Sequence, residues 1–202
     1  FDPKYQPTLM NLQDELDKEG KLSVEGKQVA EGVEYYTRGS MDIFAHQTNV
    51  DVSNRFVVFN VRDLGDQLRQ IALIIVFDFI WNRMIQNKNS GVRTYCYCDE
   101  IHVMFQSYYS ANFLKQLYKR GRKYGMCITG LTQNVEDLLR SEQARGMISN
   151  SDFIMMLNQS SEDLKILAGM LNISETQMGY VTGADAGSGL LFAEKVIVPF
   201  VD

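Results

Sequence analysis

Cysteine and histidine are scarce in this sequence of 202 residues. The three cysteines, Cys96, Cys98 and Cys127, exclude a disulfide framework and point to reduced thiols in a cytosolic setting. Cys96 and Cys98 could form half of a metal site. The two histidines, His46 and His102, do not lie at ligand spacing, however, and a second cysteine pair is missing. The sequence therefore favours small core thiols over a structural zinc site.

Long apolar runs and an excess of basic charge are missing as well. The most apolar stretch runs from Ile71 to Ile85, is shorter than the roughly 20 residues that span a bilayer, and contains Asp78 and Arg83. It therefore predicts a buried helix and not a membrane span. The formal net charge of -5 argues against a surface built entirely to bind nucleic acid, although a local basic stripe could still contact it.

The composition is otherwise that of an ordinary globular protein, with 45% apolar and 22% charged residues. These values exclude disordered and collagen-like chains. The length suits one domain, or one domain with an appendage, and allows about 70% of the unfolded surface to be buried. The core is therefore not limited by the size of the chain.

Runs of β-branched and aromatic residues alternate with amphipathic helical segments. Strands are predicted at 55–61, 93–98, 126–131, 152–157, 190–193 and 196–200, the last as a hairpin or edge strand that accommodates Pro199. Helices are predicted at 66–87 and 107–124. Further helices are predicted to begin after the N-caps Asn134, Ser160 and Ser174, and two or three short helices within 9–36. This alternation predicts an α/β fold with a largely parallel sheet, in which ligands bind at the carboxyl ends of the strands.

Two of the predicted strands end in polar side chains that suit phosphate chemistry. One ends in Asp99 and Glu100, the Walker B pattern, in which the first carboxylate holds hydrated Mg2+ and the second deprotonates the attacking water. The next strand ends in Thr132, a candidate cofactor-binding residue, and Gln133, whose amide could contact the γ-phosphate or the attacking water. A solvated acid pair and a loop-starting glutamine are the alternatives, but two suitable strand ends together favour the catalytic interpretation.

The segment Lys119–Lys123 carries four basic residues ahead of the third predicted strand. It could be a solvated helix face without a function, which is the usual case for charge runs. Alternatively, Arg122 could reach across a subunit boundary as an arginine finger, a role for which Arg140 and Arg145 compete. The same stripe could instead contact nucleic-acid phosphates.

Several motifs together resemble the VirB/TraC/TrbE/CagE-type ATPases of conjugative type IV secretion. They are the Asp99-Glu100 strand end, Arg122-Lys-Tyr-Gly125, Thr132-Gln-Asn134 and Asp137-Leu-Leu139. The segments 39–49 and 59–64 also resemble the stretch that this family has before Walker B, and the similarity extends from about Gly39 to Phe200. The resemblance implies a RecA-like P-loop NTPase core with a helical insertion. Residues 1–38 would be the tail of that insertion, and 39–202 the C-terminal part of the RecA-like domain.

The resemblance also implies a function and partners. The family hydrolyses ATP with Mg2+ at the subunit interfaces of a hexamer and powers the assembly of a membrane-spanning secretion channel, or transfer through it. Channel and coupling-protein components would be the partners, and the location would be cytoplasmic, peripheral at the inner face of the cell membrane. Direct DNA binding is left open. A DNA translocase of the HerA/FtsK or coupling-protein type, and a non-catalytic interaction module, are the alternatives.

One motif of the family is missing from the sequence. The phosphate-binding loop Gly-x-x-x-x-Gly-Lys-Ser/Thr does not occur, because neither Gly20-Lys21 nor Gly26-Lys27 has the required flanking residues. In the family this loop precedes the helical insertion, so we expect the missing part N-terminal to Phe1. The chain is then expected to be the C-terminal part of an ATPase and to be inactive by itself.

Overall fold

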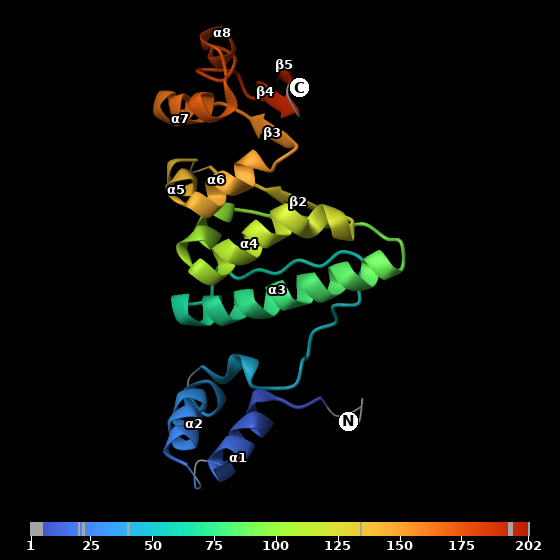
Figure 1. Cartoon of the computed structure of the whole chain (residues 1–202), viewed down its shortest axis with the longest axis vertical. Coiled ribbons are helices and arrows are strands. Elements are labelled where there is room, and N and C mark those ends of the chain that lie inside the picture. The colour runs from blue at the N-terminus through green and yellow to red at the C-terminus, as the bar shows by residue number, and fades with distance from the viewer. Residues whose placement is uncertain are drawn as a thin grey trace. The chain divides into compact units, whose positions relative to one another are not determined.

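The computed structural model describes residues 6–19, 21, 23–39, 41–133, 135–193 and 196–201 (Figure 1). The chain forms two compact units, Phe1–Arg69 and Gln70–Asp202, and the division falls in the first turn of helix α3 (Asp66–Asn89). The boundary predicted at residue 38 instead coincides with the end of helix α2 (Val24–Thr37). Where a helical insertion ends in this chain stays a prediction.

The first unit is built on two helices joined through a buried glutamine. Helix α1 (Leu9–Glu19) carries Gln13, which is 1% exposed, and α2 begins at the N-cap Ser23. The side chain of Gln13 donates from Nε2 to the carbonyl oxygen of Ala30 at 3.1 Å and accepts from Thr37 Oγ1 at 3.3 Å. A buried amide costs free energy unless it is hydrogen-bonded, so these bonds stabilise the helix pair. A 3-10 turn, η1 (Asp42–Phe44), follows.

The prediction of a strand at 55–61 is wrong. The structure has turns and irregular backbone there, and Phe56 and Val58 are 83% and 73% exposed. Strand propensity spans only about 1 kcal/mol and depends on packing against neighbouring strands. Without a partner strand, this segment gains no ladder hydrogen bonds, and Val57 and Val61 are no more than half-buried.

Helix α3 packs one face against helix α4 (Tyr108–Arg120). The rings of Phe77 and Phe113 stack with centroids 4.1 Å apart, and Met84 is fully buried. Ile74 and Ile75, by contrast, are 44% and 47% exposed, so the predicted buried helix is buried on one face only. Of the helices that the structure describes, not one combines the length and the hydropathy needed to cross a bilayer.

Strands β1 (Thr94–Cys98) and β2 (Met126–Gly130) pair in parallel, with Thr94 opposite Met126 and Cys98 opposite Gly130. They are connected by η2 (Ile101–Gln106), α4 and η3 (Gly121–Tyr124). This strand–helix–strand unit confirms the α/β fold class. It also orients both carboxyl ends toward one edge, as parallel pairing requires.

The cysteines are free, and they differ in burial. Cys98 is buried, Cys96 is half-buried with its Sγ 3.8 Å from that of Cys98, and Cys127 is exposed. The expectation of a core thiol is therefore wrong for Cys127, because alternate residues of a strand face opposite sides and its side remains uncovered. Within the described residues, no group of three or more His, Cys, Asp or Glu side chains could hold a metal ion.

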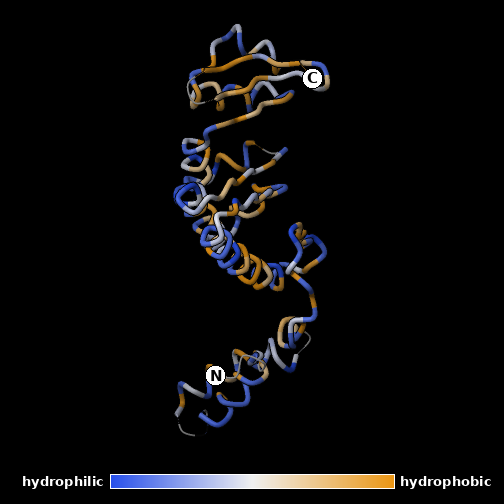
Figure 2. Tube along the Cα trace, turned by 90° about the vertical axis from the view of Figure 1, so that its right-hand side faces the viewer, coloured by the Kyte–Doolittle hydropathy of each residue, from blue (hydrophilic) through white to orange (hydrophobic). Residues whose placement is uncertain are grey.

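Strands β3 (Phe153–Met156), β4 (Ser188–Ala193) and β5 (Val196–Val201) form an antiparallel sheet, much of it drawn in the hydrophobic colour of Figure 2. Among the strands that the structure describes, the predicted parallel pairing is found between β1 and β2. Gly189 lies so close to β3 that a Cβ there would overlap the carbonyl oxygen of Met156. Pro199 lies in the edge strand β5, as predicted.

Short helices follow β2 and β3 in the sequence and contribute to the core. They are α5 (Val135–Arg140), α6 (Glu142–Ser149), α7 (Ser161–Leu171) and α8 (Glu175–Met178). Ser160 caps α7, and Ser174 forms a capping box with Gln177 at the start of α8, as predicted. The predicted cap Asn134 lies outside the described residues. The main core includes the fully buried Leu114 and Leu190.

Candidate active site

Two backbone hydrogen bonds hold the chain segments together just beyond the carboxyl ends of β1 and β2. The N–H of Leu131 donates to the carbonyl oxygen of Cys98, and the N–H of Ile101 donates to that of Leu131, both at 2.9 Å. The ladder therefore continues past the assigned strands. Residues 99–100 and 132–133 are positioned by these bonds and not by flexible loops.

Glu100 turns the chain sharply at this point. Its backbone is left-handed, with φ 45° and ψ 48°, and its N–H donates to Asp99 Oδ1 at 3.0 Å. A non-glycine residue in this conformation costs on the order of 1–3 kcal/mol, and such residues cluster at functional sites. The turn ends the strand and directs the following residues into η2.

The side chains of Glu100 and Gln133 meet across the strand ends. Gln133 Nε2 donates to Glu100 Oε1 at 3.1 Å, although 33 residues separate the two in sequence. Asp99 and Gln133 are exposed, and Glu100 is half-buried. The sequence placed these residues at one sheet edge, and the structure brings them together. Their roles as metal residue, base and γ-phosphate-contacting amide remain predictions.

His102 is a member of this cluster that the sequence analysis missed. Its Nδ1 lies 3.0 Å from Thr132 Oγ1 and 3.2 Å from Glu100 Oε2, and the side chain is 17% exposed. The second contact is an ion pair only when the imidazole is protonated. Glu100 Oε2 is buried, and within the described residues it has no hydrogen-bond partner. The spacing Glu100-x-His102 in the first turn after a strand was the available signal, but His102 had been considered only as a metal ligand.

The three arginines that compete for the finger role lie in different parts of the fold. Arg122 is exposed in η3, before β2, and so lies at the opposite end of the parallel pair from Glu100. Arg140 pairs with Glu136 at 2.7 Å and with Asp137 at 3.1 Å, and the Glu136 carboxylate raises the pKa of its guanidinium. Arg145 donates from Nε to the carbonyl oxygen of Leu139 at 2.8 Å. None of the three joins the Glu100 cluster within the described part of the chain.

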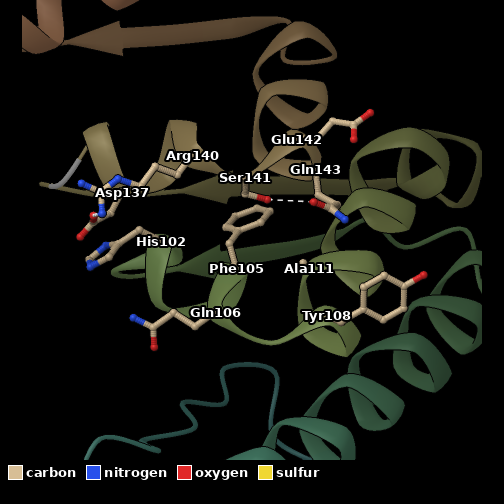
Figure 3. A pocket seen from close by; sticks show the side chains of 10 residues that line it. All are labelled: His102, Phe105, Gln106, Tyr108, Ala111, Asp137, Arg140, Ser141, Glu142 and Gln143. Atoms are coloured by element: carbon tan, nitrogen blue, oxygen red, sulfur yellow. Dashed lines mark hydrogen bonds and ion pairs between the residues drawn. The ribbon is translucent and has the colours of Figure 1, made fainter.

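An open depression of about 710 Å³ lies beside the cluster (Figure 3). Its lining comes from η2, α4, α5 and α6 and comprises His102, Phe105, Gln106, Tyr108, Ala111, Asp137, Arg140, Ser141, Glu142 and Gln143. In Figure 3 the ring of His102 lies toward Asp137 and Arg140, and the hydrogen bond from Ser141 to Gln143 lies at the other end. His102 thus connects the strand ends to an accessible cavity.

Beneath the strand ends the environment is neutral. The neighbouring Cys96 thiol and burial raise the pKa of Cys98, and burial raises the pKa of Tyr118. Both groups therefore remain uncharged near neutral pH.

A model of the TraG P-loop domain matches residues 11–186, well over half of the chain. The chain belongs to the TraG P-loop domain family. No curated protein matches this TraG-family chain. Among solved structures, VirB4 of Thermoanaerobacter pseudethanolicus is similar over 100% of this chain, with a TM-score of 0.79 and 22% sequence identity. That likeness confirms the fold, and the chain spans 57% of the length of VirB4.

The TraG P-loop domain match and the VirB4-like fold agree with the family resemblance identified from the sequence. The match begins in α1 and so includes most of the segment predicted to be the tail of an insertion. P-loop domains bind nucleotides, generally with Mg2+. The oxygen-rich strand ends and the buried, unbonded Glu100 Oε2 fit the metal and water side of such a site. The glycine–lysine loop that holds phosphates is not among the 202 residues.

Proposed function

We propose that this chain supplies the acid and amide side of an ATP-hydrolysing site in a motor subunit for conjugative DNA transfer or type IV secretion. The hydrogen bond between Gln133 and Glu100 carries the proposal. It joins the ends of two parallel strands at the edge where α/β sheets bind ligands. The family match supports the nucleotide class.

Each residue of the cluster has a distinct task in this mechanism. Bound Mg-ATP supplies the phosphoryl group and the neutralising cation. Asp99 holds the hydrated metal through its exposed carboxylate, and Thr132 contacts the cofactor. Glu100 takes a proton from the attacking water. Gln133 donates to Glu100 Oε1 and presents the rest of its amide to the water or the γ-phosphate.

The phosphate cradle comes, in this proposal, from residues outside the 202, and an arginine such as Arg122 acts on a neighbouring subunit. The chain alone is then inactive, and a hexamer with channel and coupling-protein partners, peripheral at the inner face of the membrane, is the working state. This chain spans 57% of the length of VirB4.

The test compares two proteins: the 202-residue chain, and a longer protein that carries the Gly-x-x-x-x-Gly-Lys-Ser/Thr loop ahead of it, called here the loop-bearing protein. Calorimetry should find that the chain alone binds Mg-ATP more weakly than about 1 mM, worth only about 4 kcal/mol. The loop-bearing protein should hydrolyse ATP. Micromolar binding or turnover by the chain alone would contradict the proposed division. A loop-bearing protein that neither binds nor hydrolyses ATP would favour the non-catalytic module.

A second candidate function, contact with nucleic-acid phosphates, is favoured by one surface. Six exposed cations gather where the C-termini of α3 and α4 meet η3 and the start of β1, and they are named here the basic end: Lys88, Arg93, Lys119, Arg120, Arg122 and Lys123. Lys88 Nζ lies 4.6 Å from the ring centroid of Tyr124, and the N–H of Thr94 bonds to the carbonyl oxygen of Gly125 at 3.1 Å. These contacts bring together the segments that carry the six cations.

Local acids do not compensate this charge. Residues 79–98 and 101–135 contain eight lysines and arginines and not one aspartate or glutamate, in a chain of net charge -5. Cations at helix C-termini also complement the helix dipole, which is the purely structural explanation. Fluorescence anisotropy with labelled single-stranded DNA separates the two. Phosphate contacts require affinity to fall steeply as salt rises, and an affinity that does not respond to salt would leave only the dipole.

A further inference from the structure

His102 joins two segments that come from different strands. It lies in the first turn of η2, directly after the Glu100 turn, and its Nδ1 faces Glu100 Oε2 at 3.2 Å and Thr132 Oγ1 at 3.0 Å. Thr132 follows β2, and Glu100 follows β1. A single nitrogen atom therefore lies between the predicted base and the end of the neighbouring strand.

The chemistry of these two oxygens determines which tautomer fits. An ionised carboxylate can only accept hydrogen bonds, whereas a threonine hydroxyl can donate or accept. If Nδ1 carried no hydrogen, its lone pair would face a lone pair of Glu100 Oε2 at 3.2 Å. With a hydrogen on Nδ1, the imidazole can donate to Thr132 Oγ1 or to Glu100 Oε2. The surroundings therefore favour the Nδ1–H form.

A purely structural explanation is that His102 is a half-buried histidine satisfied by Thr132 alone. The orphaned oxygen argues against it. Glu100 Oε2 is a buried acceptor without a hydrogen bond among the described residues, and leaving a buried acceptor unsatisfied is unfavourable. The His102 Nδ1 already faces this oxygen at 3.2 Å. A small rotation of the imidazole or of the threonine hydroxyl exchanges the acceptor.

We infer that His102 is a positioning residue for Glu100. Its Nδ1–H donates to the buried Glu100 Oε2, and a change in the hydrogen bonding of Thr132 alters this contact. The inference rests on the proposed function, because Glu100 needs a fixed orientation only if it acts as a base. Gln133 donates to Glu100 Oε1, and His102, which also contacts Thr132, faces Glu100 Oε2. The two residues after β2 therefore act on both carboxylate oxygens, Gln133 directly and Thr132 through His102. His102 also lines the depression of Figure 3.

The first experiment reads the tautomer directly in the 202-residue chain by nitrogen-15 NMR of the imidazoles. The sequence has two histidines, so a His46→Gln variant assigns both signals, and the exposed His46 serves as the internal reference. We expect the Nδ1–H form at His102. The Glu100 carboxylate disfavours an Nδ1 that carries no hydrogen. Glu100→Ala removes this acceptor and should increase the Nε2–H form of His102, whereas the tautomer of His46 should not change. An Nε2–H signal in the unaltered chain, or a tautomer that does not respond to Glu100→Ala, overturns the inference.

The second experiment uses the loop-bearing protein and three variants. In asparagine and histidine the δ nitrogen is bonded to Cγ, so His102→Asn keeps a donor at the place of Nδ1, whereas His102→Gln moves it outward and His102→Ala removes it. We expect His102→Asn to retain kcat within about threefold, and the other two to lower kcat by about 100-fold with little change in KM, the scale of a misplaced catalytic group. Equal losses in all three variants overturn the positioning role. Absence of turnover in the unaltered loop-bearing protein overturns the proposed function, and the tautomer measurement then still reports whether the hydrogen bond exists.

Discussion

The two ends of the parallel strand pair carry opposite chemistry. At the carboxyl ends, the Glu100 carboxylate lies 3.1 Å from the Gln133 amide nitrogen and 3.2 Å from His102 Nδ1, next to Asp99. At the amino ends, about 13 Å away by strand rise, lie the six cations of the basic end. Both sets are positioned by the same two strands. The difference shows that the acid end is built by hydrogen bonds between side chains, whereas the basic end is an uncompensated surface.

The packing beneath the two ends differs in the same way. Leu114 of α4 belongs to the main core with Cys98 and Ile101, under the carboxyl ends. Leu117, one turn later, belongs to a separate cluster with Met84 and Met126, under the amino ends. One amphipathic helix thus supports each end through a different residue, which makes the two ends separately testable.

The largest expected effect is at the acid end. Glu100→Gln in the loop-bearing protein keeps the shape of the side chain but removes the proton acceptor, so kcat should fall by about 10²–10⁴-fold while ATP binding persists. Turnover and calorimetry measure the two quantities. The matched control is Glu136→Gln, an exposed residue paired with Arg140, which should leave both unchanged. Turnover that survives Glu100→Gln would remove Glu100 from the mechanism.

Truncating a core leucine under each end should destabilise the structure around that end. Leu114→Ala and Leu117→Ala, at 0% and 1% exposure, should each lower the free energy of unfolding by about 2–5 kcal/mol in urea titrations. Hydrogen exchange then locates the loss. Leu114→Ala should deprotect the Leu131 N–H that bonds to Cys98, and Leu117→Ala the Thr94 N–H that bonds to Gly125. Identical exchange patterns in the two variants would mean that the ends form one cooperative unit.

The basic end should respond to charge removal in a salt-dependent way. If it contacts nucleic-acid phosphates, Arg122→Gln should weaken binding of single-stranded DNA and lower the slope of log K against log salt by about 0.7. Lys165→Gln, an exposed cation on α7, removes the same charge elsewhere and should not change the slope. Equal slopes for both variants would show that the effect is one of net charge alone.

The smallest effect is expected at Tyr124. Lys88 lies over its ring at 4.6 Å, and such exposed cation–π contacts are worth about 0.5–1 kcal/mol. Lys88→Gln should therefore lower the free energy of unfolding by no more than this amount. Lys119→Gln removes a neighbouring charge on α4 without that ring contact and is the control. A loss equal to that of the control would assign the effect to general electrostatics.

Much of the candidate site was predictable because its signals are local. Asp99 and Glu100 follow an apolar strand directly, and Gln133 follows the next one, so parallel pairing was enough to bring them to one edge. The cap Ser160 and the capping box at Ser174 are also short-range patterns and are found as expected. The role of His102 was not predictable, because the residue lies past the strand end, in η2, where strand pairing does not determine the direction of a side chain.

The sequence by itself determined which side chains are available at the ends of β1 and β2, since a strand that stops at a polar pair presents that pair wherever the strand lies. Only the tertiary structure decided which strands find partners. Segment 55–61 has strand-forming residues but no neighbour, and β3 pairs with β4 and β5 in antiparallel register. Only the tertiary structure brought one imidazole nitrogen between a carboxylate and a hydroxyl. Pairing and contact are long-range events, and their free energy depends on residues that local patterns do not contain.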